Sequence, residues 1–183
     1  MRKLKYHEYK LLRKADFLKW KRERNLREVK VARRYHLSNP EEYHQYSKIV
    51  GDVKQLCAKI QELKPDDPVR IQRTDDLMTK LYDMGIISLK SGLEECSKVT
   101  VSAICRRRLP VVMKRLKFAE TLTEATTLIE QGHIRIGPTQ VKDPAMLITR
   151  SMEDFVTWVD TSKIKRKVSQ FNDNLDDYDL LNA

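Results

Sequence analysis

The chain has 183 residues, enough for one or two compact domains, and its 36 Lys and Arg against 26 Asp and Glu give a formal net charge of +10. No window approaches about 18 consecutive apolar residues, and no apolar stretch follows the basic N-terminus. The sequence therefore predicts neither a transmembrane helix nor a secretory signal. Three cysteines without a C-x-x-C pair and only five glycines argue against a zinc or disulfide framework and against a glycine-rich phosphate loop, so we expect no metal and no cofactor.

The positive charge is concentrated in two separate regions. Residues 1–40 carry a net charge of +10 and residues 101–150 a net charge of +5, whereas residues 41–100 and 151–183 carry −2 and −3. Two basic regions of this kind indicate a polyanionic partner.

Residues 1–37 are predicted to form a basic helical arm. Leucines recur there at roughly helical spacing, and Lys or Arg occupies most of the other positions. The pattern is compatible with a solvated charged face, but a block this one-sided repels itself unless an anion neutralises it, which favours contact with nucleic acid. The candidate contact residues of the arm are Lys3, Lys5, Lys10, Arg13 and Lys14.

Residues 38–100 are predicted to form a helical body. The run from Ser38 to Glu42 combines a cap residue, a proline and two acidic residues, which is typical of a helix start, and the run 65–68 breaks this helix. A second helix ends at Gly85, which suits a left-handed C-terminal cap, and we expect the two helices to pack antiparallel. Residues 88–100 resemble a loop with a short strand or turn. The predicted inward-facing residues are Tyr43, Tyr46, Val50, Val53, Cys57, Ile60, Ile71, Leu77, Met78 and Leu81.

Residues 101–161 are predicted to form a small α/β module, followed by a C-terminal segment with an acidic tail at 162–183. A short helix carries Leu109, Val112, Met113 and Leu116. A second helix opens at Thr121 with a capping box, in which Thr121 accepts from the backbone and Glu124 reaches back. Strands are expected around 133–136, 146–148 and 155–159. The predicted fold class is α+β: an N-terminal helical region followed by an α/β module of two short helices packed on a small bent sheet.

The residues of this module resemble the S4-like RNA-binding module. The matching positions are Arg107-Arg108-Leu109, Ala119, Thr121, Ala125, Leu128-Ile129, Gly132-His133-Ile134-Arg135-Ile136 and Trp158-Val159. Upstream, Leu26-Arg27-Glu28-Val29, Asp66-Asp67-Pro68 and Leu81-Tyr82-Asp83-Met84-Gly85-Ile86 are similar to the helical region of small-ribosomal-subunit protein S-four. Residues 1–20 and 99–110 are closer to the nucleolar relatives of that protein in the U3 small nucleolar ribonucleoprotein.

The resemblance implies that the first two helices and the hairpin of the module present a positive face to structured RNA. The candidate residues are Arg106, Arg107, Arg108, Lys114, Arg115, Lys117, Thr121, His133, Arg135 and Arg150. Three consecutive guanidiniums at 106–108 point in different directions on any regular element, so we expect two of them to touch phosphate. His133 is expected either to contact RNA or to be a satisfied surface histidine. A-form RNA hides its base edges, so such a face should recognise shape, phosphate and 2′-OH.

The resemblance further implies an RNA-binding structural protein of the small-subunit processome. Such a protein would contact U3 small nucleolar RNA and pre-ribosomal RNA, the 18S precursor, and assist their pairing. It would act in the nucleolus with the Mpp-ten protein complex and other processome proteins, and without a membrane. A small-subunit ribosomal protein of the S-four type is the alternative, although the C-terminal aspartates argue against it. We expect no enzyme, because the chain shows no catalytic constellation and leaves no room for a separate catalytic domain.

Overall fold

The computed structural model describes residues 2–14 and 17–173, without the side chains at positions 14, 17–25 and 40. The chain divides into two compact units, Met1–His44 and Gln45–Ala183, and each is treated by itself. The predicted contact of Lys14 and the acidic tail after residue 173 lie outside the described side chains. No described helix is long and apolar enough to cross a bilayer.

The first unit is helical, as the sequence predicts for the basic arm. It contains α1 (Tyr6–Lys14), α2 (Phe17–Tyr35) and the start of α3 (Pro40–Gln61), which begins at the predicted proline. Within the unit, His44 lies 3.7 Å from Glu28. The apolar side chains that α1 leaves exposed are Tyr6, Tyr9, Leu11 and Leu12.

The second unit begins with the helical body, formed by the rest of α3 and by α4 (Pro68–Asp83) and α5 (Leu93–Ser97). The short helix α6 (Val101–Cys105) follows, at the start of the predicted α/β module. Asp67 caps α4, because its side chain accepts from the Val69 N–H at 2.9 Å, and Pro68 occupies the first turn. The chain leaves α4 through Gly85, whose φ of +71° confirms the predicted left-handed residue.

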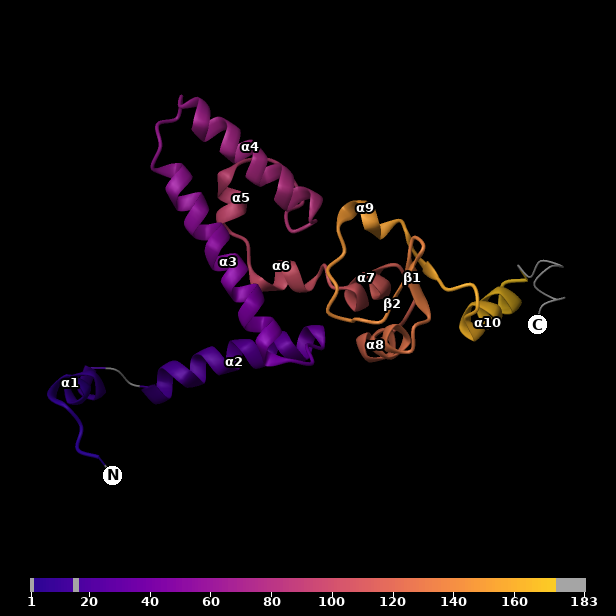
Figure 1. Ribbon diagram of the computed structural model, residues 1–183, viewed down its shortest axis with the longest axis horizontal. Helices are drawn as coiled ribbons and strands as arrows, with labels where there is room; N and C mark the ends of the chain where they lie inside the picture. The colour runs from indigo at the N-terminus through magenta and orange to yellow at the C-terminus, as the bar shows by residue number, and fades with distance from the viewer. Residues whose placement is uncertain (1, 15–16, 174–183) are drawn as a thin grey trace. The chain divides into compact units, whose positions relative to one another are not determined.

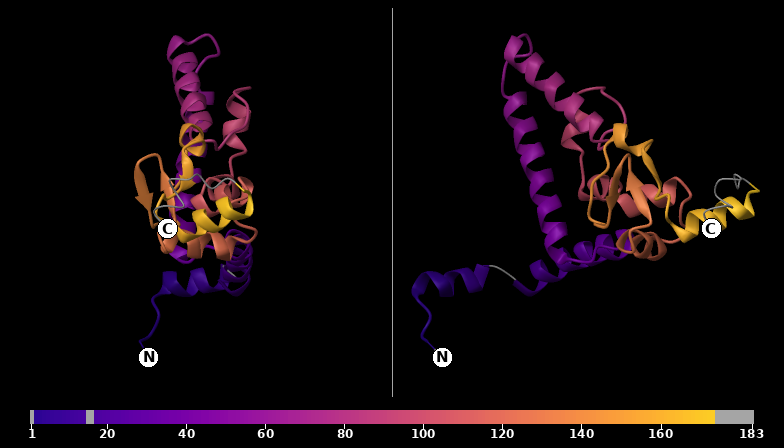
Figure 2. Two further views of the ribbon diagram at one scale, coloured as in Figure 1. Left: turned by 90° about the vertical axis from the view of Figure 1, so that its right-hand side faces the viewer. Right: turned by 45° about the vertical axis from the view of Figure 1, so that its right-hand side comes forward.

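Three predictions for this body are corrected. The segment 88–100 contains the helix α5, not a strand, and Cys96 of α5 lies buried against Cys57 of α3. Helices α3 and α4 splay apart from the loop that joins them, and α5 lies between them (Figures 1 and 2). They therefore do not pack along their lengths. Ile71 is 54% exposed, so it is not one of the inward-facing residues of α4.

The C-terminal part of this unit has the predicted α/β architecture. Helices α7 (Leu109–Arg115) and α8 (Leu122–Glu130) pack on each other. Strands β1 (Ile134–Ile136), β2 (Thr139–Val141) and β3 (Val156–Trp158) form an antiparallel sheet in the order β2-β1-β3. One apolar core joins the two layers, and its buried residues are Leu109, Val112, Met113, Ala119, Ala125, Leu128, Ile129, Ile134, Val141, Ile148 and Val156. The α+β fold class is therefore confirmed.

Two features of this part differ from the prediction. Residues 146–148 do not form a sheet strand, because they bond instead to the chain entering α7: Leu147 makes a single bridge to Arg108, and the Ile148 N–H donates to the Arg107 carbonyl at 2.8 Å. The helices α9 (Arg150–Glu153) and α10 (Lys163–Phe171) were not predicted. Ser162 caps α10 by accepting from the N–H groups of Ile164 and Lys165.

Candidate nucleic-acid interface

The three consecutive arginines between α6 and α7 have different environments. Arg106 is exposed at the end of α6, whereas Arg107 is 6% and Arg108 1% exposed. The tight turn from α6 into α7 places Ile104, Cys105 and Leu109 in the interior and takes two of the arginines with them. Arg107 and Arg108 therefore do not lie on an open surface, and a contact of either with phosphate stays a prediction.

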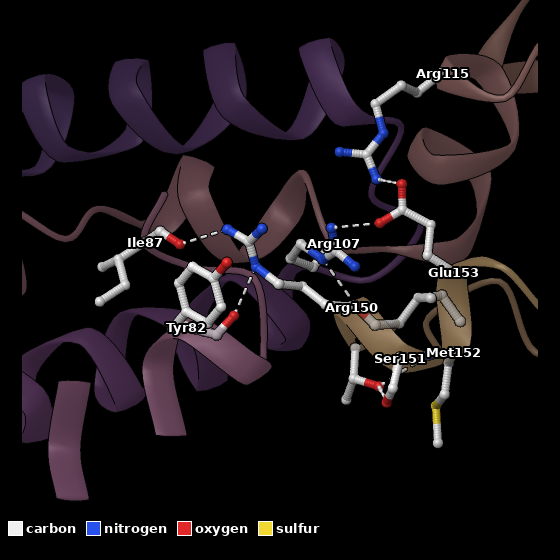
Figure 3. Close-up of polar contacts among 10 residues, drawn as sticks. Tyr82, Ile87, Arg107, Arg115, Arg150, Ser151, Met152 and Glu153 are labelled. Carbon is white, nitrogen blue, oxygen red and sulfur yellow. Dashed lines mark hydrogen bonds and ion pairs between the residues drawn. The ribbon is translucent and has the colours of Figure 1, made fainter. Parts of the chain in front are cut away.

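Arg107 is held by contacts on several sides (Figure 3). Its Nε donates to the Ile148 carbonyl at 2.8 Å, and its Nη1 donates to the Glu153 carboxylate at 3.0 Å. The guanidinium also lies directly on the backbone at Gly85, where an added Cβ would be 2.7 Å from Nε. Because its partners come from the α4 end and from the α9 region, Arg107 joins segments that are far apart in the sequence.

Arg108 and Arg150 join the helical body to the α/β part in a similar way. The Arg108 Nη1 donates to the Tyr46 hydroxyl of α3 at 3.3 Å. Arg150 donates from Nε to the Tyr82 carbonyl at 2.8 Å and from Nη2 to the Ile87 carbonyl at 2.9 Å, and its Cζ lies 4.0 Å from the Tyr82 ring centroid (Figure 3). These carbonyls follow or lie at the end of α4, so the arginine neutralises the partial negative charge of a helix C-terminus.

Glu153 is the shared anion of this network. Its carboxylate accepts from Arg107 and also from Arg115, which extends from the last turn of α7 (Figure 3). The Glu153 side chain is 21% exposed and the Arg115 side chain 52% exposed, so this ion pair reaches the surface. Arg107 and Arg115 each donate one N–H to a different oxygen of Glu153, so the carboxylate bridges the two guanidiniums.

The structure brings four of the predicted residues to one place. A cleft of about 450 Å³ in the second unit is lined by Gly85, Ile86, Ser88, Arg106, Arg107, Arg115, Arg150 and Glu153. We call it the arginine cleft. Four guanidiniums and one carboxylate line it, so its local charge is positive.

The other predicted residues of the module lie outside the arginine cleft. Lys114 and Lys117 are exposed at the C-terminal end of α7 and just after it. Thr121 caps α8, because its Oγ1 accepts from the Glu124 N–H at 3.2 Å, while Glu124 reaches back to the Glu120 N–H at 3.1 Å. The Thr121 cap is thus confirmed, whereas Glu124 reaches back to the N–H of Glu120 and not to that of Thr121. A structural bond engages the Thr121 hydroxyl, whose contact with RNA stays a prediction.

His133 and Arg135 are engaged in contacts within the sheet region. The His133 Nδ1 lies 2.9 Å from the Ser162 hydroxyl, and Arg135 donates to Asp160 at 2.6 Å and to Thr157 at 3.2 Å. The hydrogen bond from Lys165 and the charges of Lys165 and Arg135 lower the pKa of Asp160. These contacts favour the interpretation of His133 as a satisfied histidine.

The basic arm belongs to the first unit, whereas the arginine cleft belongs to the second. Lys3, Lys5, Lys10 and Arg13 are exposed along and before α1. Their exposure leaves them available to an anion, and their role in RNA contact stays a prediction.

Sequence reasoning missed the role of Glu153 and the basic helix α10. That helix carries Lys163, Lys165, Arg166 and Lys167, and Ile164 packs against the apolar core. The signal for α10 was present, because Ser162 precedes apolar residues at 164, 168 and 171, which share one helical face. Nothing local marks Glu153, since both of its partners are distant in sequence.

Comparison with known families divides the chain in two. Residues 3–106 match the ribosomal protein S4/S9 N-terminal domain, and residues 107–154 match the S4 domain. The boundary falls inside the run of three arginines.

Several known proteins are similar to most or nearly all of the chain. The U3 small nucleolar ribonucleoprotein protein IMP3 of Saccharomyces cerevisiae is 52% identical over 181 residues, which cover 98% of this chain and 99% of that protein. The human protein of the same name is 48% identical over 181 residues, with 98% of each chain covered. The small ribosomal subunit protein uS4 of Methanococcoides burtonii is 30% identical over 154 residues, covering 81% of this chain and 82% of that protein.

Proposed function

The chain belongs to the IMP3 family of U3 small nucleolar ribonucleoprotein proteins, and from this membership we propose that it is an RNA-binding structural component of the small-subunit processome. In this role it contacts U3 small nucleolar RNA and pre-ribosomal RNA and assists their pairing during 18S rRNA processing. The observation that carries the proposal is the 52% identity to the yeast protein over nearly the full length of both chains.

The distribution of charge supports RNA as the ligand. The arm carries a net +10 over residues 1–40, and its described cations are exposed. In the second unit, Lys114, Lys117 and the arginine cleft add positive charge around α7. Each cation that neutralises a phosphate releases condensed counterions, so binding of this kind is driven by phosphate contacts and weakens with salt.

A physical mechanism for assisted pairing follows from the same charges. Two RNA strands repel each other as they approach, and a protein that neutralises phosphates on both lowers that repulsion. The two basic regions of the chain are separated by a body with a net −2 over residues 41–100. We propose that one region engages U3 RNA and the other pre-ribosomal RNA.

We further propose that the protein acts in the nucleolus and joins the Mpp-ten protein complex with other processome proteins. The exposed tyrosines and leucines of α1 support a protein contact in addition to an RNA contact, because apolar side chains gain little from phosphate. The function proposed for the chain is assembly, with no reaction catalysed.

Crosslinking the tagged full chain in cells and sequencing the bound RNA tests the proposal. Reads should concentrate on U3 RNA and on the 18S precursor. A purified chain should also accelerate annealing of the two RNAs in a fluorescence energy-transfer assay. Replacing Lys114 and Lys117 by Gln should slow annealing, whereas Lys64→Gln, which removes an exposed charge on the α3–α4 connection, should not.

The alternative is a small-subunit ribosomal protein, which the S4/S9 domain match and the 30% identity to an archaeal uS4 favour. The same experiment separates the two functions. Reads confined to mature 18S rRNA, together with co-sedimentation of the chain with mature small subunits, would reject the processome proposal.

A further inference from the structure

The arginine cleft has more positive charge than its own residues neutralise. Its walls come from the turn after α4, the connection between α6 and α7, the end of α7, and α9. Glu153 is the one carboxylate among the residues that line it, and its oxygens already serve Arg107 and Arg115. The lining therefore carries four positive charges and one negative charge.

The buried and the exposed arginines of the cleft have different roles. Arg150 is anchored to two backbone carbonyls and Arg107 to one carbonyl and Glu153, so both are fixed in place. Arg106 is exposed and Arg115 half-exposed, so these two can reorient toward a ligand. The cleft thus combines two fixed cations with two cations that are free to move, a combination that suits an anion site.

One atom of Arg107 is left without a bond. Its Nη2 is buried and has no hydrogen-bond partner among the described residues. A buried N–H group without a partner is unfavourable, more so when it carries charge. Because Arg107 lines the cleft, an anion bound there would offset part of this cost by charge attraction.

We propose that the arginine cleft binds one phosphodiester group of the RNA backbone, and that Glu153 occupies the Arg115 donors when no phosphate is present. The proposal rests on the proposed RNA-binding function. On binding, Arg115 turns from Glu153 to the phosphate, while Arg107 keeps its bond to the carboxylate and Arg106 closes from the other side. Glu153 is thus a competitor within the chain that lowers the affinity of the free site.

The surroundings of the cleft favour a phosphate polymer over a single protein carboxylate. Lys114 precedes Arg115 on α7, and Lys117 follows it, and both are exposed. An RNA strand carries a phosphate at every nucleotide, so it can contact these lysines and the cleft at the same time. A single acidic side chain can contact either a lysine or the cleft, but not both. The guanidinium fork also matches two oxygens of a phosphate.

The test measures binding of a fluorescein-labelled RNA hairpin with a single-stranded flank to the full chain, by fluorescence anisotropy at several salt concentrations. Glu153→Gln keeps the shape of the side chain but removes the competing charge, so it should bind the hairpin about fivefold more tightly. Arg115→Gln should bind about fivefold more weakly, and the slope of log affinity against log salt should be shallower by about one.

Two matched variants serve as controls. Asp154→Asn removes an exposed carboxylate next to Glu153 that does not line the cleft, and Arg73→Gln removes an exposed arginine of α4. Both should bind the hairpin like the wild-type chain. A melting curve of each variant verifies folding, and if Glu153→Gln is unfolded at the assay temperature, Arg106→Gln replaces it, with weaker binding expected.

The outcomes are distinct. In one outcome, the wild-type chain binds the hairpin with an affinity that falls with salt, and the cleft variants bind it as the controls do. This result would overturn the cleft proposal and leave the proposed function standing. A wild-type chain that does not bind the hairpin at all would overturn both. If Arg115→Gln loses binding to labelled polyglutamate while its affinity for RNA is unchanged, the cleft takes an acidic protein and the phosphate proposal is wrong.

Discussion

Gly85 is expected to be the glycine least tolerant of substitution in the chain's described part. Its φ is +71°, a conformation that costs an L-residue about 1–2 kcal/mol. An added Cβ would also lie 2.7 Å from Nε and 2.8 Å from Cζ of Arg107. That guanidinium cannot retreat freely, because Ile148 and Glu153 hold it on its other sides.

The magnitude for Gly85→Ala follows from these two effects together. Displacing Arg107 weakens an ion pair that is buried at the arginine but 21% exposed at Glu153, so its loss costs less than the about 3–5 kcal/mol of a fully buried pair. Partial displacement adds a fraction of that to the conformational cost. We expect Gly85→Ala to lower the free energy of unfolding by about 3 kcal/mol, measured from urea denaturation followed by circular dichroism.

Two other glycines provide the comparison. Gly132 has a similar φ of +77°, but its added Cβ would meet the end of the Gln140 side chain, which is exposed and can move. Gly132→Ala should therefore cost about 2 kcal/mol, mostly from its φ and from one weakened hydrogen bond. Gly51 lies inside α3 with nothing within 4 Å of an added Cβ, so Gly51→Ala should stabilise by about 0.5–1 kcal/mol. If Gly85→Ala proves no more harmful than Gly132→Ala, the contact with Arg107 contributes nothing to stability.

Four further outcomes follow from the contacts described. Arg150→Met should destabilise the chain by about 2 kcal/mol in urea, because two carbonyls lose their donor and an aromatic ring loses its cation; an unchanged midpoint would contradict this. Thr121→Ala should cost about 1 kcal/mol through the lost cap, with the salt dependence of RNA binding unaltered, whereas a shallower slope would restore a phosphate role. Burial raises the pKa of the Cys57 and Cys96 thiols, so iodoacetamide at neutral pH should label neither in the folded chain and both after unfolding, as read by mass spectrometry. The lowered pKa of Asp160 stabilises the fold above the ordinary Asp pKa of about 3.9, and this contribution is lost as pH falls through the lowered value. Melting curves of Asp160→Asn should therefore vary less with pH in that acidic range than those of the wild type.

The elements that sequence predicts well are those whose signals are local. The Asp67-Pro68 start and the Gly85 end of α4 depend on residues within a turn of each other, and so does the cap at Thr121. The alternation of β1 is equally local. The caps and the left-handed glycine are satisfied by bonds that span a few residues. The alternation of β1 can be read from a few residues, although its ladder also joins it to the distant β3.

The burial of Arg107 and Arg108 could not be predicted in this way. A run of three arginines indicates a charged surface when read alone. Their partners lie 41 and 46 residues away for Arg107 and 62 residues away for Arg108, so the sequence around them contains no sign of the carbonyl, carboxylate and hydroxyl that receive them. Glu153 could not be predicted for the same reason. Its partners are Arg115 of α7 and Arg107 of the segment that leads into α7, and both are distant in sequence.

The guanidinium contacts that cross between the two family domains limit how the chain can be divided. The domains meet between residues 106 and 107, yet Arg108 and Arg150 on one side bond to Tyr46, Tyr82 and Ile87 on the other. If the chain were cut at that boundary, the guanidinium donors would be in one fragment and their oxygen acceptors in the other. The S4 region of this chain is therefore not an interchangeable cassette. A graft from another protein would fit only if it brought the matching carbonyl and hydroxyl positions of its own helical neighbour, so the two regions are expected to change together over evolution.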